Sequence, residues 1–135
     1  MKKLIMCVLV IVSIIGLTSC KVDTECKDKL RDLEFTVVEN VEVPDELKKM
    51  IEEKKMQPFK ISYNNGEFLY ICEGYGEQNT GGYSIQVNSV YETENGICFD
   101  STLIGPSKSD AVTQVLSYPY VVIKLEMIDK NIIFK

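Results

Sequence analysis

The sequence predicts a mainly β domain with one N-terminal helix, folded as an antiparallel β-sandwich or an open barrel. From residue 59 onward, short runs of apolar and β-branched residues recur between turns rich in asparagine and glycine. Ahead of them, residues 44–57 are the only good helix candidate, with apolar residues at helical spacing. The 135 residues suffice for one domain of ordinary size.

The helix is predicted to open at Pro44 and to end before Pro58. Proline suits a first helical turn, and the acidic residues that follow it complement the positive end of the helix dipole. The apolar stripe consists of Leu47, Met50 and Ile51. The valine-rich residues 34–43, ahead of the helix, are expected to form a strand or an extended segment.

A hairpin is predicted next, with strands at residues 59–63 and 68–72. The sequence Asn64-Asn65-Gly66 lies between them, and Asn-Gly accepts the positive φ angles of a tight turn. The second strand is apolar without alternation, which is typical of a central strand buried on both faces.

The remaining strands are expected in two further hairpins. Residues 83–90 alternate, but Val90 breaks the phase and predicts a bulge near Asn88 or Ser89. A turn at Asn95-Gly96 leads into a strand at residues 97–103. After a polar segment, residues 105–117, a last hairpin is predicted from residues 120–128 and 132–134.

The N-terminus has the features of an export signal. Lys2 and Lys3 precede an apolar stretch, residues 4–17, that is short for the roughly 20 residues of a membrane span. Leu17-Thr18-Ser19-Cys20 resembles the lipobox of bacterial lipoproteins, in which the cysteine is acylated after cleavage. Several acyl chains anchor stably where one does not. The alternative is an ordinary N-terminal transmembrane anchor.

The expected organisation is therefore a signal peptide at residues 1–19, a lipidated tether at residues 20–32 and a single β-rich domain at residues 33–135. Cys20 is the predicted lipidation site, which implies a location at the extracytoplasmic face of a bacterial cell membrane. Cleavage removes two lysines and no acidic residue, which leaves 13 basic and 20 acidic residues and a net charge of −7. This balance argues against nucleic acid and anionic lipid headgroups as partners.

Three cysteines, Cys26, Cys72 and Cys98, remain after cleavage and acylation. An odd number in an exported chain allows one disulfide with a free thiol, or three free thiols. Because Cys72 and Cys98 lie in predicted strands, they are suited to be small buried apolar residues, and a bridge between them is one of the alternatives.

The sequence lacks the usual signatures of catalysis. It has no histidine, no Cys-x-x-Cys pair and no Gly-x-Ser-x-Gly elbow. Glu73 and Glu77 are carboxylates that could form an acid and base pair, although solvated surface positions explain them more simply. We expect no enzymatic activity, no cofactor and no metal.

The least ordinary segment is the glycine-rich loop before the third long strand. Gly81 and Gly82 permit backbone conformations that other residues refuse, and the aromatic Tyr83 follows at once. Loops mounted between two strands often carry binding function. The simpler explanation is a turn whose glycines satisfy local geometry.

Three separated blocks resemble the C-terminal domain of the PrcB-type protease-complex lipoproteins. They are Gly76-Glu77-x-x-Thr80-Gly81-Gly82-Tyr83-Ser84-Ile85, Gly105-Pro106 with Val112-Thr113-Gln114-Val115, and Tyr118-Pro119-Tyr120-Val121-Val122-Ile123. The resemblance covers about residues 59–127. It implies a non-catalytic role in binding and stabilising a surface protease. Gln78 and Asn79 stand where a lysine or proline is common.

The partner-binding residues that this resemblance implies lie in the glycine-rich loop and in the polar segment that follows the strands. They are Glu77, Gln78, Asn79, Thr80, Gly81, Gly82, Tyr83, Gln114 and Tyr118. The expected partner is an extracytoplasmic protein, and the first candidate is a protease. Asn79-Thr80-Gly81-Gly82-Tyr83 is also similar to a loop of the chagasin-type cysteine-protease inhibitors, which enters the protease cleft. The alternatives are therefore a protease inhibitor and a purely structural envelope lipoprotein.

Overall fold

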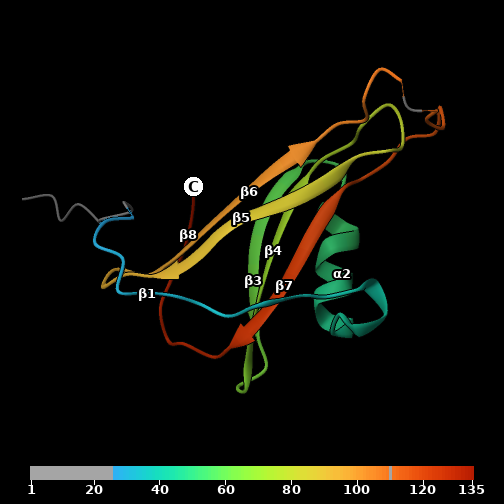
Figure 1. Cartoon of the computed structure of the whole chain (residues 1–135). Helices are drawn as coiled ribbons and strands as arrows, with labels where there is room; N and C mark the ends of the chain where they lie inside the picture. The colour runs from blue at the N-terminus through green and yellow to red at the C-terminus, as the bar shows by residue number, and fades with distance from the viewer. Residues whose placement is uncertain (1–25, 110) are drawn as a thin grey trace, which may run out of the picture.

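The computed structural model describes residues 26–109 and 111–135. The predicted signal peptide, Cys20 and the first part of the tether lie outside the described residues. The described residues form two four-stranded sheets and one α-helix, α2 (Asp45–Lys54), which lies against one of the sheets (Figure 1). The strands are β1 (Arg31–Asp32), β2 (Thr36–Val37), β3 (Pro58–Asn64), β4 (Phe68–Tyr75), β5 (Ser84–Glu92), β6 (Ile97–Ile104), β7 (Tyr120–Glu126) and β8 (Ile132–Phe134).

The first sheet has the order β1-β5-β6-β8 and the second the order β2-β7-β4-β3. Every neighbouring pair is antiparallel except β6 and β8, which are parallel. Because the two sheets are separate and pack on one another, the structure is sandwich-like and confirms the first of the two predicted architectures.

Two apolar clusters hold these layers together. Between the sheets lie Leu69, Ile71, Val90, Ile97, Phe99, Val121, Ile123 and Leu125. On the other face of the second sheet, α2 covers Val38, Val43, Leu47, Ile51, Tyr70, Cys72 and Val122. Successive residues of β4 enter opposite clusters, as the pleat requires. The prediction of a central strand buried on both faces is thus confirmed.

The helix begins where it was predicted and ends three residues early, at Lys54. Its stripe buries Leu47 and Ile51 completely or nearly so. The strand or extended segment expected at residues 34–43 is confirmed in part, because β2 pairs and Glu39 is extended, but a 3-10 helix, Asn40–Glu42, follows. Valines are abundant here, but only Val38 and Val43 are buried, and a spacing of five residues does not fit the two-residue period of a strand.

Both tight turns lie where they were predicted, and the first has the predicted chemistry. Gly66 in the β3–β4 turn has a φ of +91°, and the Asn65 side chain accepts hydrogen bonds from the backbone N–H groups of Glu67 and Phe68. The β5–β6 turn is organised by the buried Thr93, whose Oγ1 donates to the carbonyl oxygen of Gly96. The register of β5 against β6 shifts between Val87 and Ser89, which confirms the predicted bulge.

The last predicted hairpin is wrong. β7 lies in the second sheet, whereas β8 crosses to the first sheet and pairs in parallel with β6. The connecting residues Met127 and Ile128 pack against the cluster between the sheets, so the chain passes from one layer to the other. Apolar periodicity predicts which side chains are buried, but it does not specify which strand is the neighbour.

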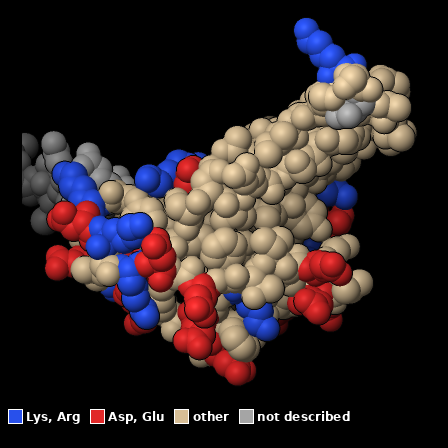
Figure 2. All heavy atoms as spheres, viewed as in Figure 1, with Lys and Arg blue, Asp and Glu red and all other residues tan. Residues whose placement is uncertain are grey.

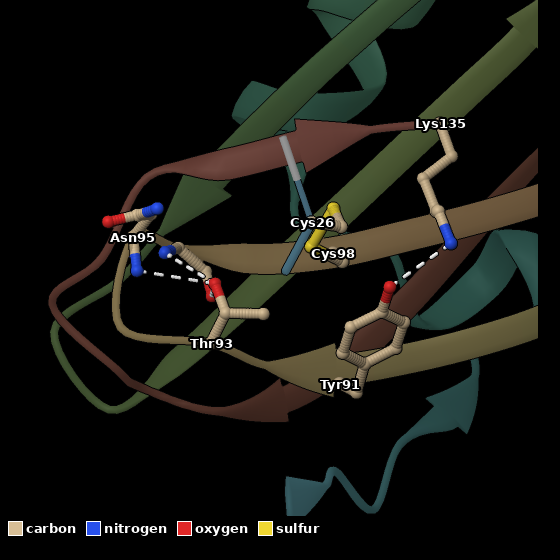
Figure 3. The surroundings of a disulfide bond; sticks show 7 residues. Cys26, Tyr91, Thr93, Asn95, Cys98 and Lys135 are labelled. Carbon is tan, nitrogen blue, oxygen red and sulfur yellow. Dashed lines mark hydrogen bonds between the residues drawn. A yellow bond between two sulfur atoms is a disulfide. The ribbon is translucent and has the colours of Figure 1, made fainter. Parts of the chain in front are cut away.

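A disulfide joins Cys26 to Cys98, the second residue of β6, as Figure 3 shows. The alternative bridge between Cys72 and Cys98 does not form. Cys72 faces the cluster under α2, whereas Cys98 alternates with core residues of β6 and faces away from the other sheet. The residues after Cys26 follow the first sheet and pair with β5 from Arg31, so this part of the expected tether lies on the domain.

Cys72 is a free, fully buried thiol. Burial, assisted by the neighbouring Glu73 carboxylate, raises the pKa of this thiol to about 12. Among the described residues, no helix combines the length and apolar character needed to cross a bilayer.

Candidate functional site

Two segments that the sequence singled out meet at one end of the sandwich (Figure 1). Residues 76–83 connect β4 to β5, and residues 105–109 and 111–118 lie between β6 and β7. Gln78 and Ser117 form an antiparallel bridge, with N–H to carbonyl distances of 2.8 and 3.0 Å. We call these two segments together the tip. The tip therefore brings together residues that lie almost 40 positions apart in the chain.

The glycines of the tip allow its two segments to approach closely. Gly82 has a φ of +85°, and a Cβ atom there would lie 2.8 Å from a side-chain carbon of Val112. A Cβ atom on Gly81 would lie 2.6 Å from the Thr113 hydroxyl oxygen, and the Gly81 N–H donates to the Thr113 carbonyl oxygen across 3.0 Å. Packing between the two segments thus explains both glycines, and at Gly82 the positive φ is a second reason.

Side chains add further contacts across the tip. The Ser117 hydroxyl donates to the Thr80 carbonyl oxygen across 2.6 Å, and the Tyr118 hydroxyl donates to Glu77 Oε1 across 3.2 Å. The hydrogen bond to the Glu77 carboxylate raises the pKa of Tyr118. The ammonium group of Lys55, next to the end of α2, lies 5.1 Å from the centre of the Tyr118 ring. These contacts therefore hold the two segments of the tip together and connect the tip to the end of α2.

The nine predicted partner-binding residues all lie at the tip, but they differ in accessibility. Glu77, Asn79, Gly82 and Gln114 are exposed, whereas Gln78, Thr80, Gly81, Tyr83 and Tyr118 are half-buried. Gln78 and Thr80 use backbone groups to join the segments, and the Gln78 side chain also donates to the Tyr75 carbonyl oxygen. These half-buried residues shape the tip, and the exposed ones can contact a partner directly.

The segments that form the tip also lie within the part of the chain that matches a protein family. Residues 69–126 match the model of the PrcB C-terminal family. The resemblance found in the sequence is thereby confirmed. The match runs from β4 to the end of β7 and leaves out α2 and β3. No curated protein and no solved structure matches the chain.

Exposed apolar side chains lie at the tip of the PrcB-matching segment, and the sequence reasoning missed them. Val115 is 66% exposed and Leu116 is 50% exposed, and Ile104 at the end of β6 is 43% exposed. The sequence feature that could have revealed them is the adjacent pair Val115-Leu116 within the mainly polar residues 105–117. Large apolar side chains grouped on a surface are typical of interaction sites.

The PrcB-matching segment is also poor in charge where it approaches the tip. Residues 78–91, 101–107 and 111–123 contain no charged residue, although 26% of the whole chain is charged. Figure 2 shows the same contrast, because acidic and basic side chains gather over the lower half of the molecule and the part that extends toward the tip is largely uncharged. Depletion of charge is a feature of the centres of protein interfaces.

The two glutamates considered as a catalytic pair belong to different surroundings. Glu73 is 5% exposed, and its Oε1 accepts a hydrogen bond of 3.0 Å from Ser101 of β6, whose hydroxyl also contacts Tyr75. Burial is the main reason why the pKa of Tyr75 is raised. Glu77 instead accepts from Tyr118 at the exposed tip. Within the described residues, Glu73 Oε2 has no hydrogen-bond partner.

Proposed function

We propose that this protein is a lipoprotein anchored through a lipid on Cys20 at the extracytoplasmic face of a bacterial cell membrane. In this proposal the tip binds a surface protease and stabilises it, without a catalytic step of its own. The observation that carries the proposal is the meeting of the two PrcB-like loops at one end that is poor in charge, with exposed Val115 and Leu116.

The position of the anchor supports this arrangement. Cys20 lies six residues before Cys26, which is bonded to Cys98 near the β5–β6 turn. The tip follows Ile104 at the other end of β6, and six residues of strand span about 20 Å. A lipid on Cys20 would thus hold the domain by the end opposite the tip, so that the tip remains accessible to a neighbouring protein.

The test compares affinity-tagged full-length variants recovered from detergent-solubilised membranes of the cell that makes the protein. The Val115→Ser/Leu116→Ser double variant removes the exposed apolar groups of the tip. The matched control is Val37→Ser/Val41→Ser, because these two valines are 57% and 82% exposed ahead of α2. We expect the wild type and the control to recover the same protease, and the tip variant to recover at least tenfold less. Equal recovery of the protease by all three proteins would show that the tip is not the binding surface.

Two rival functions predict different results with the same proteins. An inhibitor would lower the activity of the recovered protease in proportion to its concentration, whereas a stabiliser preserves activity or lengthens its lifetime. A structural envelope lipoprotein would lose stability in a Thr80→Ala/Gly81→Ala/Tyr83→Ala variant but would show no partner to lose. Mass spectrometry of the native N-terminus tests the anchor, since an intact Met1 without acylation would contradict it.

A further inference from the structure

The strand β5 has an edge without a partner next to the tip. At its far end, Arg31 and Asp32 of β1 pair with Glu92 and Tyr91, and the Leu33 N–H donates to the Val90 carbonyl oxygen. Within residues 26–109 and 111–135, nothing pairs with residues 84–88 on the side away from β6. We call residues 84–88 the open edge. Its backbone donors and acceptors on that side are free to bind another strand.

The open edge lacks the features that usually prevent strand addition. Soluble proteins protect sheet edges with proline and with lysine or other charged side chains. The long outer strand of the second sheet, β3, follows this rule, because it begins with Pro58 and carries Lys60, whose ammonium group lies over the ring of Phe134. The free part of β6 begins with the charged Asp100. The open edge contains no proline and no charged residue.

We propose that the open edge binds an extended, uncharged segment of the partner protein as an additional strand of the first sheet. This inference rests on the proposed function, since the partner is the protein bound by the tip. Main-chain hydrogen bonds would supply affinity, as in other cases of strand addition. The alternating outward side chains of Ser84, Gln86 and Asn88 would contact the side chains of the added strand on that face.

The dimensions of the open edge favour a different protein over a second copy of this chain. Five residues of strand span about 17 Å. Pairing of two such edges covers far less than the roughly 800 Å² per partner of a stable interface. In a symmetric pairing, the bulge between Val87 and Ser89 would also interrupt the ladder twice. A partner that already contacts the tip needs only a short strand to extend its interface along β5.

Photo-crosslinking of the full-length protein in its native cells tests this inference. A photoreactive amino acid, p-benzoylphenylalanine, replaces Ser84 in one variant and Gln86 in another, because both side chains are exposed. The matched control carries it in place of Ser62, an exposed uncharged residue of β3. We expect both edge variants to crosslink to one segment of the partner, with attachment points about two residues apart, and the control to give none. That register is the signature of an added strand.

A second measurement places lysine side chains on the open edge, where their charge should prevent the addition of a strand. The Ser84→Lys/Gln86→Lys variant should recover at least tenfold less partner from solubilised membranes, whereas Ser62→Lys/Asn64→Lys on β3 should match the wild type. Circular dichroism spectra and melting temperatures of both variants check that the fold is intact. If the lysine variants of the two edges recover the partner equally, strand addition at β5 is excluded.

The outcomes separate this inference from the proposed function. Crosslinks to scattered positions, to a second copy of the chain or to nothing would overturn strand addition, while loss of the partner in the Val115→Ser/Leu116→Ser variant would still support the tip. Ordered crosslinks together with undiminished recovery by that tip variant would support the open edge and remove the tip as the binding surface.

Discussion

The Ser117 hydroxyl donates a hydrogen bond of 2.6 Å to the carbonyl oxygen of Thr80, 37 residues earlier in the chain. Together with the backbone bridge between Ser117 and Gln78, this bond joins the two segments of the tip. Ser117→Ala should therefore lower the free energy of unfolding by about 1 kcal/mol. Urea denaturation measures the loss, and Ser84→Ala, at an exposed position of β5, is the control. An unchanged value for Ser117→Ala would mean that the bond contributes nothing.

Gly82 and Gly66 form a matched pair that separates backbone strain from packing. Both have positive φ angles, but only at Gly82 would a Cβ atom meet neighbours, Val112 at 2.8 Å and Pro106 at 3.1 Å. Gly66→Ala should cost about 1 kcal/mol, through strain alone. Gly82→Ala should cost about 1–3 kcal/mol more, because the added atom overpacks the tip. Thermal and urea unfolding compare the two variants, and equal losses would contradict the close approach seen at Gly82.

The disulfide closes a loop between residues that are 72 positions apart. In the chain-entropy description, a loop of this length stabilises the folded state by about 4 kcal/mol, and measured losses for native disulfides are typically about 2–5 kcal/mol. The Cys26→Ser/Cys98→Ser variant should therefore unfold at a clearly lower urea concentration than the oxidised protein. The reduced wild type should behave like this variant. Coincident unfolding curves before and after reduction would show that the bridge is absent in solution.

Cys72 should be unreactive in the folded protein. With a pKa of about 12, only about one thiol in ten thousand is ionised at pH 8, whereas about one in ten would be at the ordinary value of 9.0. Alkylation at pH 8 should therefore be at least a thousandfold slower in the native protein than in urea. Rapid labelling of the native protein would show that the thiol is accessible and that the α2 layer opens readily.

The raised pKa of Cys72 also makes the stability of the folded protein depend on pH in alkaline solution. The folded state keeps the thiol protonated above pH 9, while the unfolded state loses the proton, so the unfolded state binds fewer protons. The contribution of the protonated Cys72 thiol to the free energy of unfolding is fully present below pH 9 and is lost as the pH rises toward 12. Cys72→Ala removes this dependence. A wild type and a Cys72→Ala variant with parallel stability curves between pH 9 and 11 would contradict the assignment.

Much of the fold followed from local sequence signals. The β3–β4 hairpin was predictable because Gly66 marks its turn and because β4 is apolar on both faces. The bulge of β5 was visible in the break of alternation at Val90. Each of these features depends on residues that are close together in the chain, where period and turn chemistry are informative.

The features that were missed depend on contacts over long distances in the sequence. Nothing in the alternation of residues 120–134 specifies that β8 leaves its neighbour β7 and pairs with β6. Likewise, the pairing of Cys26 with Cys98 depends on the path of the N-terminal segment along the first sheet. The family resemblance pointed to the two segments that meet at the tip, but the exposure of Val115 and Leu116 appears only once these segments are packed together.

The covalent link at Cys98 determines how mechanical load enters the domain. A pull on the chain ahead of Cys26 does not first peel away β1, whose two paired residues would detach one after the other. The force reaches β6 directly, in the middle of the first sheet, where β5 and β8 flank it on either side. To extract β6, such a force would have to break the backbone ladders on both sides together, so the sandwich is built to resist tension applied from its N-terminus.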